Sequence, residues 1–212
     1  MEIDVFYDIV CPWCYIGKRR LSQALARRPD LRPTVHWRAF LLNPNMPAEG
    51  IERDIYLIRK FGSESRVRRI QGTLVEAGQS VEIPFDFNRI RRTPSSINAH
   101  RFAFFAERHG ACEAAVERLF AAFFLEGRDI GDNDILADLG EEIGLDRADL
   151  AGYLAGPGDM TRVSEENERA HRLGINGVPS YVFNRRFVIS GAQDPQVLAR
   201  MIDAAVAVGD AA

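Results

Sequence analysis

The chain contains few cysteines and no long hydrophobic run. Three of its 212 residues are cysteine, and no stretch approaches the roughly 18 consecutive apolar residues of a membrane span. The opening residues, MEID, lack the basic start and apolar core of a secretory signal. A chain of this length buries a sizeable core without a disulfide framework. We therefore expect a cytoplasmic protein.

Several functional classes lack their usual signals. The formal net charge of −3 gives no strong attraction to nucleic acid or to an anionic membrane. The sequence also has no serine-hydrolase elbow, zinc-protease motif, phosphate-binding loop or dinucleotide fingerprint. We expect neither nucleic acid nor membrane as a partner, and no tightly bound cofactor.

The order of the predicted elements indicates the fold. Short β-branched runs predict strands at 3–9, 34–42, 180–183 and 186–189. A helix follows the first strand and ends at Pro29, residues 50–172 are mostly helical, and a last helix begins at Asp194-Pro195. Asp132 and Asp146 suit helix N-caps. The order β-α-β, helices, β-β-α predicts an α/β thioredoxin-like fold with a large all-helical insertion domain. Residues 1–45 and 173–212 would form the thioredoxin-like domain and 46–172 the insertion.

Two of the cysteines stand together in the stretch DIVCPWCYIG, as Cys11 and Cys14. A structural zinc site needs four ligands, whereas this chain offers one such pair and scattered histidines. Two cysteines packed as small hydrophobic residues are a second alternative. The position between a strand and a helix favours a redox pair. Unpaired amides and the helix dipole would stabilise a thiolate at Cys11, and Cys14 would resolve a mixed disulfide.

A second signal lies far along the chain, in the stretch NGVPSYVF. Pro179 precedes a predicted strand directly. One interpretation is an ordinary Gly–Pro turn. The other is a loop with a cis peptide bond before Pro179, held against the cysteine pair, in which the backbone of Val178 pairs with a substrate. The cysteine pair and the β-β-α ending favour the second.

Two further residues have alternative interpretations. Asp8, three residues before Cys11, either accepts a proton from Cys14 or hydrogen-bonds loop amides. Cys112 shares the helical spacing of Val116 and Phe120, which predicts a buried, inert thiol.

Taken together, the stretches YDIVCPWCYIGKRRL, FLLNPNMPAEG, TPSSINAHR and NGVPSYVFNRRFVISGAQ resemble the DsbA-like thioredoxin superfamily, and in particular its FrnE-like cytoplasmic branch. Related members are the 2-hydroxychromene-2-carboxylate isomerases and the kappa-class glutathione transferases. The resemblance implies that Cys11 is the nucleophile, Cys14 the resolving thiol and Pro179 the cis proline. The chain differs from oxidant-type DsbA proteins in Trp13, which adds bulk but no positive charge between the cysteines.

The expected function is that of an intracellular thiol-disulfide oxidoreductase or isomerase. Its partner would be a disulfide- or thiol-containing protein or a small thiol, with glutathione as a possible redox partner. Trp13, Val178, Asn43 and His100 are the candidate substrate-binding residues. The first alternative is a glutathione-dependent isomerase or transferase acting on a small aromatic or polyketide-like molecule. The second is a binding module without thiol turnover.

Overall fold

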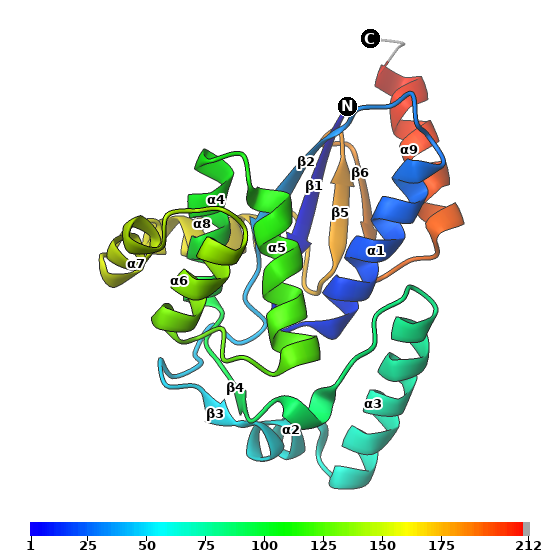
Figure 1. Cartoon of the computed structure of the whole chain (residues 1–212). Helices are drawn as coiled ribbons and strands as arrows, with labels where there is room; N and C mark the ends of the chain where they lie inside the picture. Colours follow the sequence, from blue (N-terminus) through cyan, green and yellow to red (C-terminus); the bar gives the residue numbers. More distant parts are fainter. Residues whose placement is uncertain (210–212) are drawn as a thin grey trace.

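The structure is a computed structural model, and it describes residues 1–209. Its main sheet has four strands in the order β2-β1-β5-β6 (Figure 1). These strands are β1 (Glu2–Tyr7), β2 (Thr34–Ala39), β5 (Ser180–Phe183) and β6 (Phe187–Ser190). A separate two-stranded sheet pairs β3 (Ile51–Glu52) with β4 (Arg92–Thr93). Together with the helices, this is an α/β thioredoxin-like fold with a helical insertion.

The two ends of the chain complete one sheet. Strand β1 pairs in parallel with β2, where Val5 lies opposite Trp37. On its other side β1 pairs antiparallel with β5, where Val5 lies opposite Tyr181. Strand β1 is therefore central and buried on both faces, which explains why its residues other than Glu2 and Asp4 are all apolar. The predicted element order is confirmed.

In the described residues, nine α-helices and two short helical segments surround and extend this sheet. In chain order, all of them are α1 (Pro12–Ala26), α2 (Arg53–Phe61), α3 (Glu64–Gln79), the 3₁₀ segment η1 (Phe87–Arg89), α4 (Ile97–Arg108), α5 (Cys112–Ala121), the π-helical segment η2 (Ala122–Glu126), α6 (Asn133–Glu142), α7 (Arg147–Ala155), α8 (Met160–Arg172) and the final α9 (Pro195–Gly209). Figure 1 shows α1 and α9 side by side, with α4, α6, α7 and α8 gathered on the other side of the molecule and α5 between the two groups.

Alternating residues of β1 face different helices. Ile3, Val5 and Tyr7 belong to the main core, which continues through residues of α1, α4, α5 and α9. Phe6 points to the opposite face and packs with Ala170 of α8. Because the main core runs without a break from the sheet into the inserted helices, the insertion packs as part of the same hydrophobic interior.

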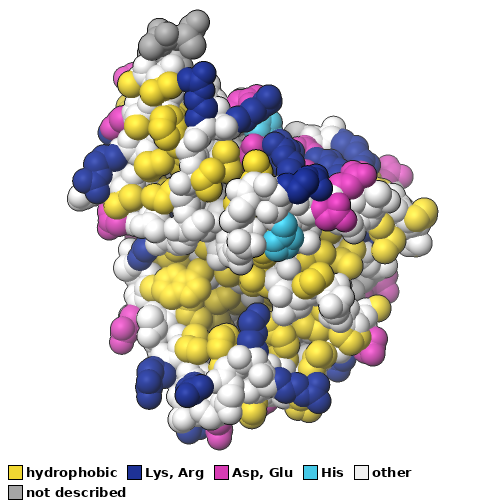
Figure 2. All heavy atoms as spheres, turned by 180° about the vertical axis from the view of Figure 1, so that it is seen from behind, with side chains coloured by type: hydrophobic (Ala, Val, Ile, Leu, Met, Phe, Trp, Pro, Cys, Tyr) yellow, Lys and Arg dark blue, Asp and Glu magenta, His cyan; other side chains and the backbone are white. Residues whose placement is uncertain are grey.

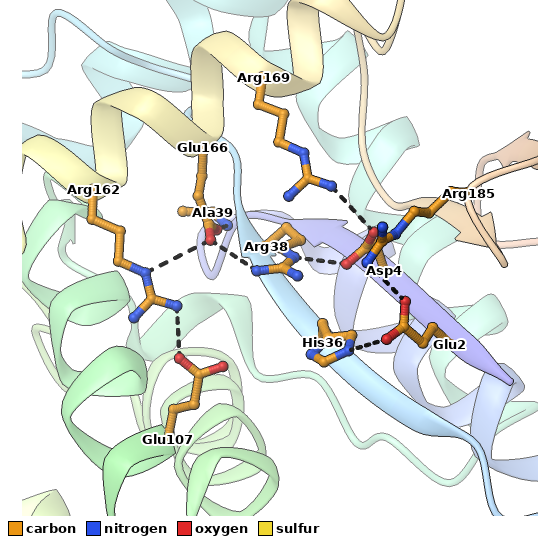
Figure 3. Close-up of polar contacts among 10 residues, drawn as sticks. All are labelled: Glu2, Asp4, His36, Arg38, Ala39, Glu107, Arg162, Glu166, Arg169 and Arg185. Carbon is orange, nitrogen blue, oxygen red and sulfur yellow. Dashed lines mark hydrogen bonds and ion pairs between the residues drawn. The ribbon is translucent and has the colours of Figure 1, made fainter.

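Charged groups join α8 to the sheet (Figure 3). Glu166 of α8 accepts a hydrogen bond of 2.7 Å from the backbone N–H of Ala39, and Arg38 donates to it at 3.2 Å. Arg38 also donates to Asp4 of β1 at 2.7 Å, and Arg169 lies 3.6 Å from the same carboxylate. Asp4 and Glu166 are buried, so each carboxylate needs these partners. The contacts fix the helix on the far face of the sheet.

Local capping predictions are confirmed. Asp132 accepts from the amide of Asp134, and Asp146 accepts from the amide of Asp149. Asp194 accepts from the amide of Gln196 at 2.8 Å, at the start of α9. Each carboxylate satisfies a first-turn amide that has no partner within its helix.

Several predicted boundaries need correction. Strands β1 and β2 end at Tyr7 and Ala39, because the chain turns away from the sheet before 9 and 42. The hairpin turn takes three residues, and Asn184 and Arg185 both have positive φ. Residues 50–172 also include the two-residue strands β3 and β4 and an irregular stretch before α4. The domain boundaries remain predictions, and 210–212 of the predicted segment 173–212 lie outside the described residues. Within residues 1–209 no helix is long and apolar enough to cross a bilayer.

Candidate active site

Cys11 lies at the start of α1. It is the N-cap residue, with extended backbone angles, and Pro12 is the first helical residue. This is the predicted position, and it follows from Pro12, whose missing N–H suits a first helical turn. The Cys11 thiol is 5% exposed, and its sulfur lies 3.6 Å from the carbonyl oxygen of Val178. Cys11 therefore lies at a helix N-terminus, a position typical of redox cysteines, and its thiol also faces a backbone carbonyl that is 167 residues away in the sequence.

Cys14 lies behind Cys11, one helical turn into α1, and is 1% exposed. Burial raises the pKa of the Cys14 thiol well above its ordinary value, and the neighbouring Cys11 sulfur raises it further. Both cysteines are free thiols in this structure. At neutral pH Cys14 is therefore protonated, and it must lose a proton before it can attack a disulfide.

The Val178 loop is held tightly against α1. The Val178–Pro179 peptide bond is cis, as predicted. Ser180, at the start of β5, donates a hydrogen bond of 2.8 Å from its hydroxyl to the carbonyl of Gly177. On the facing helix, a methyl group added to Gly17 would lie 2.8 Å from the Pro179 ring and closer still to the Tyr181 hydroxyl. Glycine is therefore required at 17 for this close approach.

Asp8 is fully buried at the end of β1. Its carboxylate accepts hydrogen bonds from the amides of Leu42 at 2.8 Å and Val10 at 3.3 Å. The interpretation that Asp8 bonds loop amides thus agrees with the structure, while its role as a proton acceptor stays a prediction. His100 of α4 is also fully buried, and its Nε2 atom lies 3.7 Å from Asp8 Oδ1.

An apolar groove of about 470 Å³ opens beside Cys11. One side is formed by Cys11, Trp13 and Val178, and the other by residues of α2 and α3, among them Tyr56 and Leu57. Trp13 is 36% exposed, which is high for a tryptophan. Seen from behind, hydrophobic side chains gather across the middle of the molecule, with Lys and Arg side chains among them (Figure 2). The geometry allows a disulfide lying in the groove to reach the Cys11 sulfur.

The structure separates the four candidate substrate-binding residues into two groups. Trp13 and Val178 line the groove. Asn43 stands behind it, where its side-chain oxygen accepts a hydrogen bond of 2.8 Å from the Tyr56 hydroxyl. His100 has no exposed surface, so the expectation that it contacts substrate needs correction: it packs beneath the site, against Tyr7 and Asp8.

Cys112 also differs from its prediction. It begins α5 and is only partly buried, because the helix starts at this residue and leaves one side of it open. Burial, followed by the charges of Glu107 and Glu113, raises the pKa of the Cys112 thiol to about 12. An unreactive thiol at neutral pH is consistent with that shift.

Sequence reasoning missed the second wall of the groove. Tyr56, Leu57 and Lys60 come from α2, and Ile70 and Leu74 from α3. The only available signal was the apolar spacing within these helices, which indicates a buried face but not what it faces.

Comparisons with known proteins agree with this arrangement. The uncharacterized protein YwbO of Bacillus subtilis (strain 168) is 27% identical over 208 residues, which is 95% of this chain and 96% of that protein. The crystal structure of a probable DsbA oxidoreductase from Streptomyces coelicolor has a TM-score of 0.90 at 28% identity, covering 98% of this chain and 90% of that one.

A more distant structure is the cytosolic disulfide reductase DsbM from Pseudomonas aeruginosa with GSH. It has a TM-score of 0.72 at 20% identity and covers 97% of this chain and 99% of that one. At this identity the likeness concerns the fold. Residues 2–203, nearly the whole chain, match the DSBA-like thioredoxin domain family. With the Cys11 and Cys14 thiols adjacent at the start of α1, the chain therefore belongs to the DSBA-like thioredoxin domain family.

Proposed function

We propose that this protein is a cytoplasmic thiol-disulfide oxidoreductase of the FrnE-like branch, in which Cys11 is the nucleophile and Cys14 the resolving thiol. The observation that carries the proposal is the position of Cys11. Its sulfur stands at the N-terminus of α1, 3.6 Å from the Val178 carbonyl, and faces the groove. Cys14 is enclosed behind it, with its thiol next to that of Cys11.

The proposed reaction has two steps. The Cys11 thiolate attacks one sulfur of a substrate disulfide, a bond forms between the two sulfurs, and the other substrate sulfur leaves with the electron pair. Cys14 then loses its proton and attacks Cys11, which releases the second substrate thiol. The protein ends with a Cys11–Cys14 disulfide and has given two electrons to the substrate. The reverse sequence oxidises a dithiol, and the reduction potential of the pair relative to the compartment sets the direction.

The helix start and the Val178 loop support these steps. First-turn amides of α1 without helical partners favour negative charge on the N-cap residue. The carbonyl of Val178 borders the groove and can accept a hydrogen bond from a substrate amide, as in strand addition. A protein or small disulfide fits this arrangement. Glutathione is the expected soluble redox partner.

The alternative is a glutathione-dependent isomerase or transferase for a small aromatic molecule. Its support is the groove itself, since a volume of about 470 Å³ and an apolar wall are typical of small-molecule pockets. The two functions differ in their need for Cys14, which only the dithiol reaction uses.

A redox titration in glutathione buffers tests the proposal. Thiols are trapped and counted across the titration for the parent protein, for Cys14→Ser and for the control Cys112→Ser. We expect the free thiols of Cys11 and Cys14 to disappear together, and reversibly, in the parent and in Cys112→Ser. In Cys14→Ser, Cys11 should instead take up glutathione and keep it. Independent titration of the two thiols in the parent would contradict the dithiol mechanism and favour the alternative.

A further inference from the structure

Arg53 is a buried cation in the wall of the groove beside Cys11. It begins α2 and is 9% exposed, and its side chain lines the groove. Its Nε atom has no hydrogen-bond partner, and among residues 1–209 no carboxylate forms an ion pair with its guanidinium. A guanidinium is expensive to bury without a partner. Within the described residues, the protein therefore leaves this guanidinium without a carboxylate partner.

The neighbours of Arg53 do not neutralise it. Glu52 precedes it, but its carboxylate accepts from the Asp54 amide as the N-cap of α2. The guanidinium does lie over the ring of Phe87, whose centroid is 5.7 Å from the guanidinium carbon. Burial lowers the pKa of Arg53 to about 10, and the charge of Asp54 offsets only part of that effect. At neutral pH the side chain remains cationic.

The charge lining of the groove has one sign. Apart from Arg53, its only charged lining residue is Lys60, and no Asp or Glu lines it. The Lys60 ammonium donates a hydrogen bond of 2.7 Å to the Tyr56 hydroxyl, which fixes it at the rim. All other lining side chains are apolar or neutral. Such a groove attracts an anion and favours one that also has an apolar part.

We propose that the groove binds a small disulfide or thiol that carries a carboxylate next to an apolar group, with the carboxylate on Arg53 and the apolar part on Trp13 and Leu57. The proposal rests on the thiol-disulfide function and names its substrate class. A carboxylate would supply the buried guanidinium with the charge-assisted hydrogen bonds that the protein leaves unmade. The groove volume of about 470 Å³ suits a small molecule better than a folded protein surface.

The test compares two aromatic disulfides of the same shape. Dithiobis(nitrobenzoate) carries a carboxylate on each ring, and dithiobis(nitrobenzamide) carries a neutral amide in its place. The rate of the first step at Cys11 is measured for both by release of the coloured aryl thiolate. Each rate is divided by that of free mercaptoethanol, which removes the intrinsic difference in reactivity. The proteins are the parent, Arg53→Met, Arg53→Lys and a matched control, Arg68→Met, which removes a neighbouring α3 charge paired with Glu64.

We expect the parent to prefer the carboxylate by about tenfold, the effect of one charge-assisted contact. Arg53→Met should lower this ratio to about one without slowing the reaction with the amide. An unchanged rate with the amide would also show that the variant is folded. Arg53→Lys should keep part of the preference, and Arg68→Met should keep all of it. A ratio near one in the parent, or an unchanged ratio in Arg53→Met, would overturn the proposal while leaving the thiol chemistry intact. Failure of the parent to react with either disulfide would instead contradict the proposed function.

Discussion

Asp8 and His100 form a buried pair beneath the cysteines, with 3.7 Å between Asp8 Oδ1 and His100 Nε2 and no exposed surface on either side chain. The two residues come from different parts of the fold, the end of β1 and the first turns of α4. Both imidazole nitrogens lack a hydrogen-bond partner in the described residues. The charge of Asp8 is close enough to the Cys14 thiol to raise its pKa, in addition to the larger effect of burial. This places an acidic group where Cys14 must release a proton.

The first prediction concerns Asp8→Asn. Asparagine retains an oxygen for the Leu42 amide but is a poor proton acceptor. A general base contributes about 10²-fold or more to the rate of a proton transfer, so the resolving step should slow by at least about tenfold. The Cys11 mixed disulfide should then accumulate, as measured by mass spectrometry after acid quench. Asp4→Asn is the matched control, because Asp4 is a buried aspartate of the same strand that contacts Arg38 instead. Equal resolving rates in both variants would exclude a proton-accepting role.

The second prediction concerns alkaline pH and the reduced protein. The folded-state pKa of Cys14 is raised, so the unfolded chain loses this proton at lower pH than the folded protein does. The stability that this thiol contributes is present below its unfolded pKa of roughly 8.5 and is lost progressively as pH rises toward the folded value. The free energy of unfolding should therefore fall above about pH 8.5, by up to about 1.4 kcal/mol per pH unit from this group.

Denaturant unfolding of the parent and of Cys14→Ala between pH 7 and 10 measures this effect. Other groups with raised pKa values, such as Tyr15 and Cys112 at about 12, remain in both proteins, so the difference between the two slopes isolates Cys14. Parallel pH profiles would show that Cys14 titrates normally in the folded state.

The third prediction concerns the contact between α1 and the Val178 loop. In Gly17→Ala the new methyl group would collide with the Pro179 ring and the Tyr181 hydroxyl. We expect a loss of about 1–3 kcal/mol in the free energy of unfolding, which is typical of an overpacked interior, and a slower reaction of Cys11 with disulfides. Gly72→Ala is the control, since nothing lies within 4 Å of its added carbon in α3. That variant should gain up to about 1 kcal/mol through helix propensity. An unchanged free energy of unfolding in Gly17→Ala would mean that the loop moves away from α1 at little cost in free energy.

The fourth prediction concerns Arg101, the neighbour of His100. Its side chain is 1% exposed and donates to the carbonyls of Tyr153, Leu154, Gly156 and Gly158, at and beyond the end of α7. Arg101→Met would leave these carbonyls without a partner and should lower the free energy of unfolding by about 3–5 kcal/mol. Arg172→Met, which removes an exposed pair with Glu168, should change it by less than about 1 kcal/mol. A small effect of Arg101→Met would indicate that water replaces the guanidinium at the end of α7.

Some features of this structure could be predicted from residues that are close together in the sequence. Pro12 suits the first turn of a helix, and Asp132, Asp146 and Asp194 cap helices through amides two or three residues away. The two-residue strands β3 and β4 were missed because such short segments carry no periodicity. The same limit explains Cys112: its spacing matched an apolar face, but only the observed helix start shows that it lies at the edge of that face.

The sequence by itself determined the order of elements, the cysteine pair at the start of α1 and the helix caps, because each depends on residues a few positions apart. Tertiary structure decided what surrounds the cysteines. Pairing of β1 with β5 brings Val178 to Cys11, α4 brings His100 to Asp8, and α2 places Arg53 in the groove wall. These neighbours are separated by tens to more than a hundred residues, and periodicity reports that a side chain is buried without reporting its partner.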